Sequence, residues 1–323
     1  MTTNSRGWVF VLSLAACVSA IAAESGESYP NKPVRLIVGN APGGGSDFVA
    51  RLLAQHISLG QTIVIDNRAG AGGIVAAELT ANAPPDGYTM VVVASSHTSN
   101  VNLYRKLPYD TAKDFAPVTQ LTANFFFLAV NPSSPAKTVS EFVALAKAKK
   151  GALTYASAGN GQGAHLGMEL LKTLGGFDAV HVPYNGIGPA AVALVSGQVE
   201  VALLTPPTTV PLMKAGKLKV LALTGPKRLA SLADVPTVAE SGFPGYEVNN
   251  WIGVLAPART PNEIINKFYA ALARGLKVNE VVERLAAVYT EPVGSTPQEF
   301  GAFMQAEIAK WGKVIKQSGA RAD

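Results

Sequence analysis

The sequence predicts an α/β protein with two lobes joined by two crossover segments. Three observations support this prediction. Short runs of β-branched residues alternate with windows of helical periodicity, a pattern typical of sheets covered by helices on both faces. A chain of 323 residues that is 48% hydrophobic has room for two cores. Two glycine-rich loops, far apart in the chain, each follow a predicted strand and precede a predicted helix.

The first lobe is predicted to comprise residues 29–127 and 249–323. Its strands are connected by helical windows, so we expect them to run parallel. The three helices at its end each start at a proline or an asparagine. The predicted strands are 34–38, 62–65, 88–94 and 248–254, and the predicted helices are 47–57, the window around 76–80, 261–276, 279–287 and 297–319.

The second lobe is predicted to comprise residues 128–248 and to repeat the alternation. A long apolar strand at 125–130 leads the chain into it, and a helix at 140–150 follows, with Thr138 or Ser140 as its N-cap. A further helix follows the second glycine loop. The later predicted strands are 153–157, 180–183, 199–204 and 220–223.

The two glycine-rich loops are candidate seats for an anion. A helix start carries unpaired backbone N–H groups and the positive end of the peptide dipoles, and glycine lets a ligand approach that backbone closely. In the first loop we expect Ser46 or Asp47 to cap the helix. The alternative for each loop is a tight turn that binds nothing. The candidate residues are Gly43, Gly44, Gly45, Ser46 and Asp47 in the first loop, and Ser157, Ala158, Gly159, Asn160, Gly161 and Gln162 in the second.

Several function classes lack support in the sequence. The formal net charge is +5, but the basic residues are dispersed, so we expect no nucleic-acid partner. The four histidines have no zinc-ligand spacing, and the glycine pattern does not match a dinucleotide fingerprint, so no metal or cofactor is expected. His97 follows a strand end and His165 lies in the second loop, so both are candidates for contact with the ligand.

The N-terminus has the pattern of a secretory signal peptide over residues 1–23. Arg6 precedes a short apolar run, and Ala20-Ile21-Ala22 fits a small-x-small cleavage site. The protein is therefore expected in the periplasm. Cys17, the single cysteine, also fits a lipobox, so lipid anchoring is an alternative to simple cleavage.

Motifs along nearly the whole mature chain resemble those of the Bug receptors, the periplasmic solute-binding proteins of tripartite tricarboxylate transporter systems. The matching segments are Tyr29-Pro30-Asn31-Lys32-Pro33, Ala41–Asp47, Asn67–Gly73, Pro85-Asp86-Gly87-Tyr88, Leu107–Asp110, Lys113-Asp114-Phe115, Tyr155–Gly159, His181-Val182-Pro183-Tyr184, Ala215–Leu218, Asp234–Thr237 and Glu291–Gly294.

The resemblance implies a two-lobed Venus-flytrap fold of the type II-like form. It also implies that a small carboxylate is held by the two glycine loops and presented by a monomeric receptor to membrane permease subunits. Ser96 to Thr98 and Tyr184 would form walls of the site. No enzymatic activity is implied.

Three positions depart from the family pattern. Asn185 stands where a lysine is common, Thr205 where an acidic residue is common, and Asn40 where an aromatic residue is usual. These residues, with an apolar wall expected at 125–127, favour an aromatic or less polar carboxylate over an acidic amino acid. Neutral drift explains the departures equally well.

Two other function classes stay open at this point. A receptor of the same fold could present its ligand to a membrane signalling protein instead of a transporter. A hydrolase using Ser46 is the remaining alternative, although a nucleophile elbow is absent from the sequence.

Overall fold

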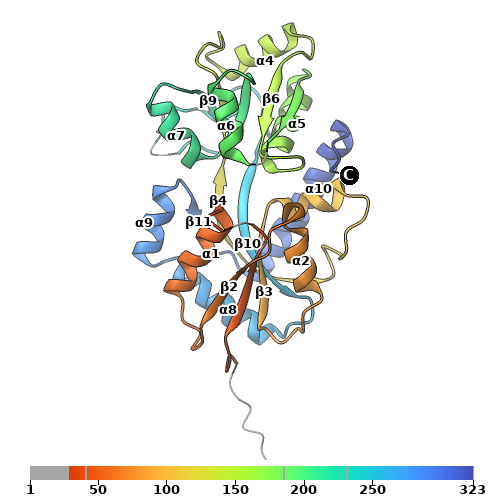
Figure 1. The fold of residues 1–323 in the computed structure, drawn as a ribbon, viewed down its shortest axis with the longest axis vertical. Helices are drawn as coiled ribbons and strands as arrows, with labels where there is room; N and C mark the ends of the chain where they lie inside the picture. Colours follow the sequence, from red (N-terminus) through yellow and green to blue (C-terminus); the bar gives the residue numbers. More distant parts are fainter. Residues whose placement is uncertain (1–28, 41, 185, 230–231, 323) are drawn as a thin grey trace, which may run out of the picture.

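A computed structural model describes residues 29–40, 42–184, 186–229 and 232–322. Within these residues the chain forms two α/β units, each built around one sheet, and Figure 1 shows them stacked along the long axis of the molecule. The predicted two-lobed α/β architecture is confirmed. The leader with Cys17 and the position of Asn185 lie outside the described residues.

The first unit is built on a sheet with strand order β11-β4-β10-β3-β1-β2. Its strands are β1 (Val34–Val38), β2 (Ile63–Asn67), β3 (Thr89–Ala94), β4 (Phe115–Phe125), β10 (Asn249–Pro257) and β11 (Glu291–Pro292). Its helices are α1 (Gly45–His56), η1 (Ala71–Gly73), α2 (Ile74–Ala81), α3 (Ser96–Leu103), α8 (Asn262–Gly275), α9 (Asn279–Ala287) and α10 (Pro297–Ser318).

The second unit is built on a sheet with strand order β7-β6-β8-β5-β9. Its strands are β5 (Phe127–Val130), β6 (Thr154–Ser157), β7 (Val180–Pro183), β8 (Val201–Leu204) and β9 (Lys219–Leu223). Its helices are α4 (Val139–Ala148), α5 (Gly163–Gly175), α6 (Ile187–Val195) and α7 (Pro206–Lys214). Thr138 caps α4, because its side chain accepts a hydrogen bond from the Glu141 N–H, which confirms one of the two predicted caps.

Both sheets are mixed, so the expectation of parallel sheets is wrong in part. The strands β1, β2 and β3 are parallel to one another, as are β6, β7 and β8. The strands β10, β4 and β5, by contrast, pair antiparallel with their neighbours. The antiparallel pairing results from the crossovers between the two units. A strand that passes straight from one sheet to the other has no crossover helix to return it in the same direction.

The crossing strand predicted at 125–130 is two strands that meet at Phe126. The Phe126 N–H donates to the Thr224 Oγ1 at 2.8 Å, and its carbonyl accepts from the Thr224 N–H. Phe125, Phe126 and Phe127 are all buried in core clusters. The three rings thus belong to the cores, and the apolar wall expected at 125–127 no longer supports an aromatic ligand.

The first sheet is covered on both faces, as its alternating side chains require. Leu36 and Val38 point into a core shared with Phe268 of α8, whereas Ile37 points into the opposite core, shared with Phe300 of α10. This arrangement leaves the carboxyl ends of β1, β2 and β3 as the edge from which loops can project.

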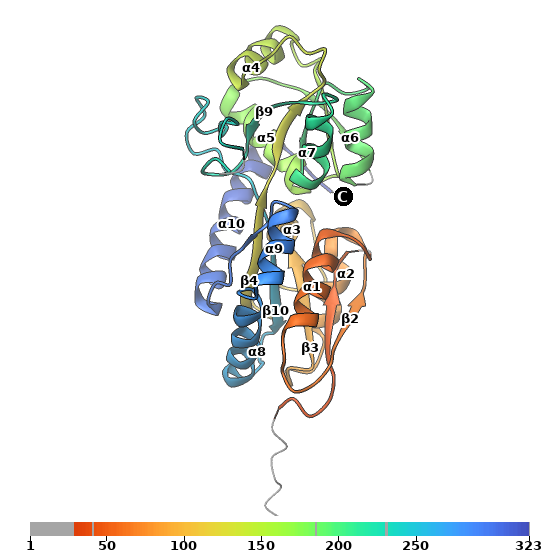
Figure 2. The ribbon, with the colours of Figure 1, turned by 90° about the vertical axis from the view of Figure 1, so that its left-hand side faces the viewer.

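The long C-terminal helix α10 binds the two units together. Its first half packs on the first sheet, and Trp311, Val314 and Ile315 near its end lie in the core of the second unit. Leu103 at the end of α3 joins the same core. Figure 2 shows α10 running beside the junction of the two units.

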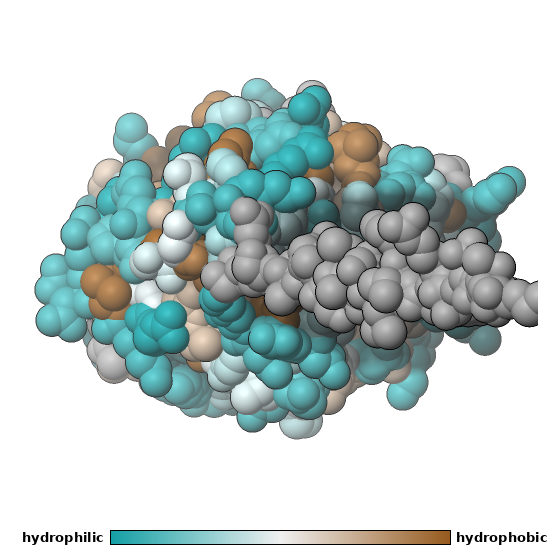
Figure 3. Space-filling model, turned by 90° about the horizontal axis from the view of Figure 1, so that it is seen from below, coloured by the Kyte–Doolittle hydropathy of each residue, from teal (hydrophilic) through white to brown (hydrophobic). Residues whose placement is uncertain are grey.

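The surface at the end of the molecule farthest from the second sheet is mainly hydrophilic, with small separate hydrophobic areas (Figure 3). Among the helices of the described residues, none combines the length and apolar character needed to cross a membrane.

Candidate functional site

The first glycine loop follows β1 and leads directly into α1. Gly43 has a φ of +82°, a conformation that favours glycine. A Cβ built on Gly43 or Gly45 would meet no atom within 4 Å, so this backbone faces open space. The helix begins at Gly45 with Gly44 as its N-cap, and no side chain caps it. The expected cap by Ser46 or Asp47 is therefore wrong, and the first N–H groups of α1 have no side-chain acceptor at the cap.

The Asp47 carboxylate fixes the first loop through hydrogen bonds. The side chain is 3% exposed and accepts hydrogen bonds from the Gly43 N–H, the Asn67 Nδ2 and the Arg51 Nε, each at 2.9 Å. Burial raises the pKa of Asp47, but the bonds from Arg51, Gly43 and Asn67 outweigh burial and hold it below its usual value. Asp47 is thus an ionised brace for the loop, and its charge is already compensated by Arg51.

The second glycine loop follows β6 and leads into α5. Gly159 and Gly161 have φ values of +138° and +71°. The N-cap of α5 is Gln162, whose side chain does not cap the helix. This loop therefore has the same arrangement as the first: a parallel strand, glycines with positive φ, and a helix start without a side-chain cap.

The second loop and the glycine turn after β2 come from different sheets, and α3 lies between them. The Ser99 Oγ of α3 donates to the Gly161 carbonyl at 3.3 Å, and the Ser96 Oγ donates to the Gly72 carbonyl at 2.9 Å. A Cβ on Gly72 would lie 3.7 Å from the Gln162 amide nitrogen. The carboxyl ends of the parallel strands of both sheets therefore meet, and such ends are where ligands bind in open α/β sheets.

The segment predicted as a strand end, Ser96 to Thr98, is the first turn of α3. His97 is 4% exposed and stacks on Tyr109, with Phe115 at its edge. Thr98 is fully buried, and its Oγ1 donates to the Ser95 carbonyl. His97 and Thr98 therefore pack inside the first unit, and the expectation that they form walls of the site is wrong. Of the three residues, Ser96 reaches a glycine turn, where its hydroxyl donates to the Gly72 carbonyl after β2.

Tyr184 and Thr205 follow β7 and β8 at the same edge as the second loop. The Tyr184 N–H donates to the Ser157 carbonyl at 3.0 Å. Tyr184 and Thr205 are both half-buried. Thr205 is the N-cap residue of α7 and its carbonyl accepts from the Thr209 N–H. Tyr184 thus borders the second loop, and Thr205 lies at the same edge of the sheet.

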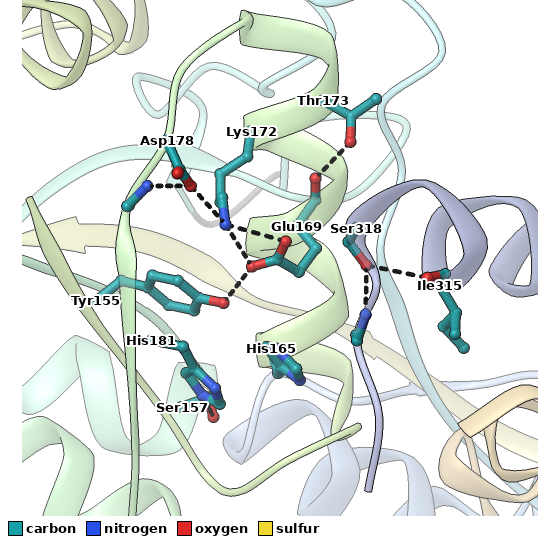
Figure 4. Close-up of polar contacts among 12 residues, drawn as sticks. Tyr155, Ser157, His165, Glu169, Lys172, Thr173, Asp178, His181, Ile315 and Ser318 are labelled. Atoms are coloured by element: carbon teal, nitrogen blue, oxygen red, sulfur yellow. Dashed lines mark hydrogen bonds and ion pairs between the residues drawn. The ribbon is translucent and has the colours of Figure 1, made fainter. Parts of the chain in front are cut away.

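A group that sequence reasoning missed lies directly behind the second loop (Figure 4). The rings of His165 and His181 stack at 4.0 Å between centroids, and Tyr155 lies 4.9 Å from His181. Tyr155 donates to Glu169 at 2.5 Å, and Lys172 pairs with Glu169 at 2.9 Å and with Asp178 at 3.1 Å. The register that pairs Tyr155 with His181 across β6 and β7 creates this group, of which the sequence singles out His165 alone.

Two hollows elsewhere on the surface contain none of the residues predicted for the site. One, of about 640 Å³, lies between the start of α4 and the segment around Asp234 and Glu240. The other, of about 280 Å³, lies beside Tyr104 and Tyr109. The candidate site is therefore defined by the two helix starts and their glycine backbone.

Comparison with known proteins decides the family. Residues 49–320 match the model of the tripartite tricarboxylate transporter family receptor. The chain belongs to this family. It is 34% identical to protein BugT of Bordetella pertussis, over 98% of this chain and 99% of that protein. The chain is thus a member of a family of solute receptors, which overrules the hydrolase alternative built on Ser46.

Solved structures agree with this assignment. The Rhodopseudomonas palustris protein Rpa4515, solved with adipate, is 37% identical with a TM-score of 0.81, covering 91% of this chain and 99% of that one. The protein MatC of Rhodopseudomonas palustris, solved with malate, is 36% identical with a TM-score of 0.77, covering 89% and 100%. The periplasmic binding protein BugD is 30% identical with a TM-score of 0.78, covering 91% and 99%.

The contact between α3 and the second loop leads to a prediction at Gly161. A Cβ on this residue would lie 2.4 Å from the Leu103 Cδ1, and φ is +71°. We expect Gly161→Ala to push α3 away from the loop and to lower the free energy of unfolding by about 1–3 kcal/mol, as overpacking does. Urea denaturation measures the loss, and small-angle scattering measures the separation of the units.

Gly216→Ala is the matched control for this variant. Its φ is +67°, but a Cβ there would meet no atom within 4 Å, so it carries similar backbone strain without the clash. Equal losses in the two variants would show that the contact between Leu103 and the loop is not tight.

Proposed function

We propose that this chain is a periplasmic receptor that captures a small carboxylate between its two glycine loops and delivers it to the permease subunits of a tripartite transporter. The observation that carries the proposal is a pair of uncapped helix starts, each at the carboxyl end of a parallel strand, in two sheets whose strand ends α3 links. Each start offers unpaired N–H groups and the positive end of a dipole to an oxygen anion.

The charges around the site favour a ligand without an ammonium group. The acidic side chain in the predicted site is Asp47, and its carboxylate is occupied by Arg51, Asn67 and the Gly43 N–H. Asn185 and Thr205 are neutral. A dicarboxylate could place one carboxylate on each loop, and the two relatives solved with adipate and with malate carry ligands of this class.

We further propose that the site comprises Ser96, Tyr184, Asn185 and Thr205 beside the two loops, which span residues 43–47 and 157–162. The leader over residues 1–23 is proposed to direct export, with Cys17 as the alternative anchoring point. The receptor is proposed to act as a monomer that closes on its ligand, because ligand contacts from both lobes favour the closed state over the open one.

The first test is binding of adipate and malate to the purified protein. A carboxylate at 100 times its dissociation constant should raise the free energy of unfolding by about 2.7 kcal/mol, visible as a shift of the melting temperature. Isothermal titration calorimetry gives the affinity and the stoichiometry, expected to be one per chain. Failure of a broad panel of mono- and dicarboxylates to bind would overturn the proposal.

A variant at Gly45 tests the first seat. Because a Cβ there meets open space, we expect Gly45→Val to change the free energy of unfolding by no more than about 0.5 kcal/mol. The branched side chain should nevertheless keep an anion from the helix start and weaken binding at least tenfold, about 1.4 kcal/mol. Gly45→Ala, with a smaller side chain, should weaken it less. Unchanged affinity in the valine variant would show that the ligand does not use this seat.

A further inference from the structure

The second glycine loop is tied to a histidine of the helix that it precedes. The Gly161 N–H donates to the Nδ1 of His165 at 2.9 Å. His165 is 6% exposed, in the first turn of α5. Since Nδ1 accepts this bond, it carries a lone pair, and the ring is neutral with its proton on Nε2.

A second histidine holds the beginning of the same loop through a serine. The His181 Nε2 lies 2.6 Å from the Ser157 Oγ, which accepts the Gly159 N–H at 3.1 Å. The rings of His165 and His181 are nearly parallel, with an interplanar angle of 6°. A proton on one ring therefore works against a proton on the other, and the pair fixes Gly159 and Gly161 together.

The charged groups around this pair do not favour a cation. On α5, Glu169 is already occupied by Lys172 and by the Tyr155 hydroxyl from β6. Asp178, before β7, is paired with Lys172. On α3, Ser99 donates to the loop and Leu103 lies against Gly161. On α10, Trp311, Val314 and Ile315 pack in the core of this unit. Burial is the main cause that lowers the pKa of both histidines to about 4. Lys172 also lowers it for both, and for His181 the charge of His165 lowers it while Glu169 raises it, without outweighing burial.

We propose that neutral His165, stacked on His181, is the positioning residue of the second ligand seat: its Nδ1 holds the Gly161 N–H and so sets the loop that receives the carboxylate. This inference rests on the proposed function and adds a residue that does not touch the ligand. Protonation at Nδ1 would replace the acceptor with a second N–H facing the Gly161 N–H, and the loop would lose its binding geometry.

Two substitutions at His165 separate positioning from packing. In His165→Asn the side-chain oxygen can accept the Gly161 N–H at nearly the same place, whereas in His165→Leu the volume is kept and the acceptor is lost. With adipate as the probe, we expect the asparagine variant to bind within about threefold of the unaltered protein and the leucine variant to bind at least tenfold more weakly. His56→Asn, on α1 at the end remote from the loops, is the control and should bind normally.

The ligand-free protein gives a second readout that does not depend on adipate. With four histidines in the chain, ¹⁵N-histidine labelling with single-residue variants assigns each ring by NMR. We expect the His165 Nδ1 to be unprotonated at pH 7, and hydrogen exchange across residues 158–164 to speed up in the leucine variant but not in the asparagine variant.

These readouts distinguish the possible failures. If adipate and the other carboxylates fail to bind while the NMR and exchange results hold, the proposed function falls and the positioning role of His165 stands. If His165 carries its proton on Nδ1, or if both variants bind and exchange alike, the positioning role is overturned whatever the ligand.

Discussion

Replacing Asp47 with alanine is expected to abolish carboxylate binding and to lower the free energy of unfolding by about 2–3 kcal/mol. The side chain accepts hydrogen bonds from three donors, one of them the charged Arg51, and it is almost fully buried. Its removal leaves the Gly43 N–H without its acceptor and the Asn67 Nδ2 with the Asn40 carbonyl alone, and hydrogen bonds to an ionised acceptor are among the stronger ones. The first loop would then lose the brace that fixes its glycines in front of α1.

Chemical denaturation and calorimetry with adipate measure the two effects. Asp47→Asn is the conservative variant. It keeps the shape and one acceptor oxygen but loses the charge, so its stability should lie between those of the alanine variant and the unaltered protein. Asp110→Asn is the control, because Asp110 accepts backbone bonds on an exposed turn remote from both loops. If the alanine variant lost stability but bound adipate normally, Asp47 would stabilise the fold without positioning the first loop for ligand binding.

Apolar runs and helical periodicity located most of the strands and helices, because strands such as β1 are buried on both faces and helices such as α8 have one apolar face. The helix α3 was missed for a physical reason: its sequence, SHTSNVNL, has no apolar stripe. Ser96, Ser99 and Asn100 are buried nonetheless, because their side chains bind the carbonyls of Gly72 and Gly161 in neighbouring loops. A helix whose buried face is polar can be recognised only when its partners are known.

The two loops could be identified from their glycines, but what lies behind them could not. The brace at Asp47 depends on Asn67, which reaches it from the neighbouring strand β2. The stack of His165 on His181 depends on the register of β6 and β7. Both are contacts between segments distant in the chain, and the periodicity of one segment does not show which residue of another segment lies opposite it.

The second large effect concerns pH: stability is expected to fall as the pH drops from 6.5 toward 4. Burial lowers the pKa of His97, His165 and His181 to about 4. In the unfolded chain these histidines titrate near 6.5. Between the two values the unfolded state binds more protons, so the free energy of unfolding rises with pH through this window. The stabilisation is fully present above pH 6.5.

Other titrating groups act outside this window or in the opposite direction. The pKa of His56 is raised by its bonds to the Leu52 carbonyl and to Glu280, so its contribution is present below pH 6.5 and is lost as the pH rises through its folded value. The carboxyl groups of Asp47 and Asp66 have a lowered pKa, and the stability that they contribute is lost only as the pH falls below their unfolded values near 4. The decline between pH 6.5 and 4.5 therefore belongs to the neutral histidines.

Urea denaturation at pH 7.5, 6.5, 5.5 and 4.5 measures this decline. His97 and His165 should each contribute a loss on the order of 2 kcal/mol by pH 4.5, and the half-buried His181 less. His97 is the sharper site for substitution, because its Nε2 is buried without a hydrogen-bond partner among the described residues and its ring lies between Tyr109 and Phe115. His97→Leu should remove the part of the pH dependence that is due to His97. It should change the free energy of unfolding little near pH 7.5, since no hydrogen bond to Nε2 is lost. A decline as steep in this variant as in the unaltered protein would mean that His97 is already protonated in the folded state, in conflict with its apolar surroundings.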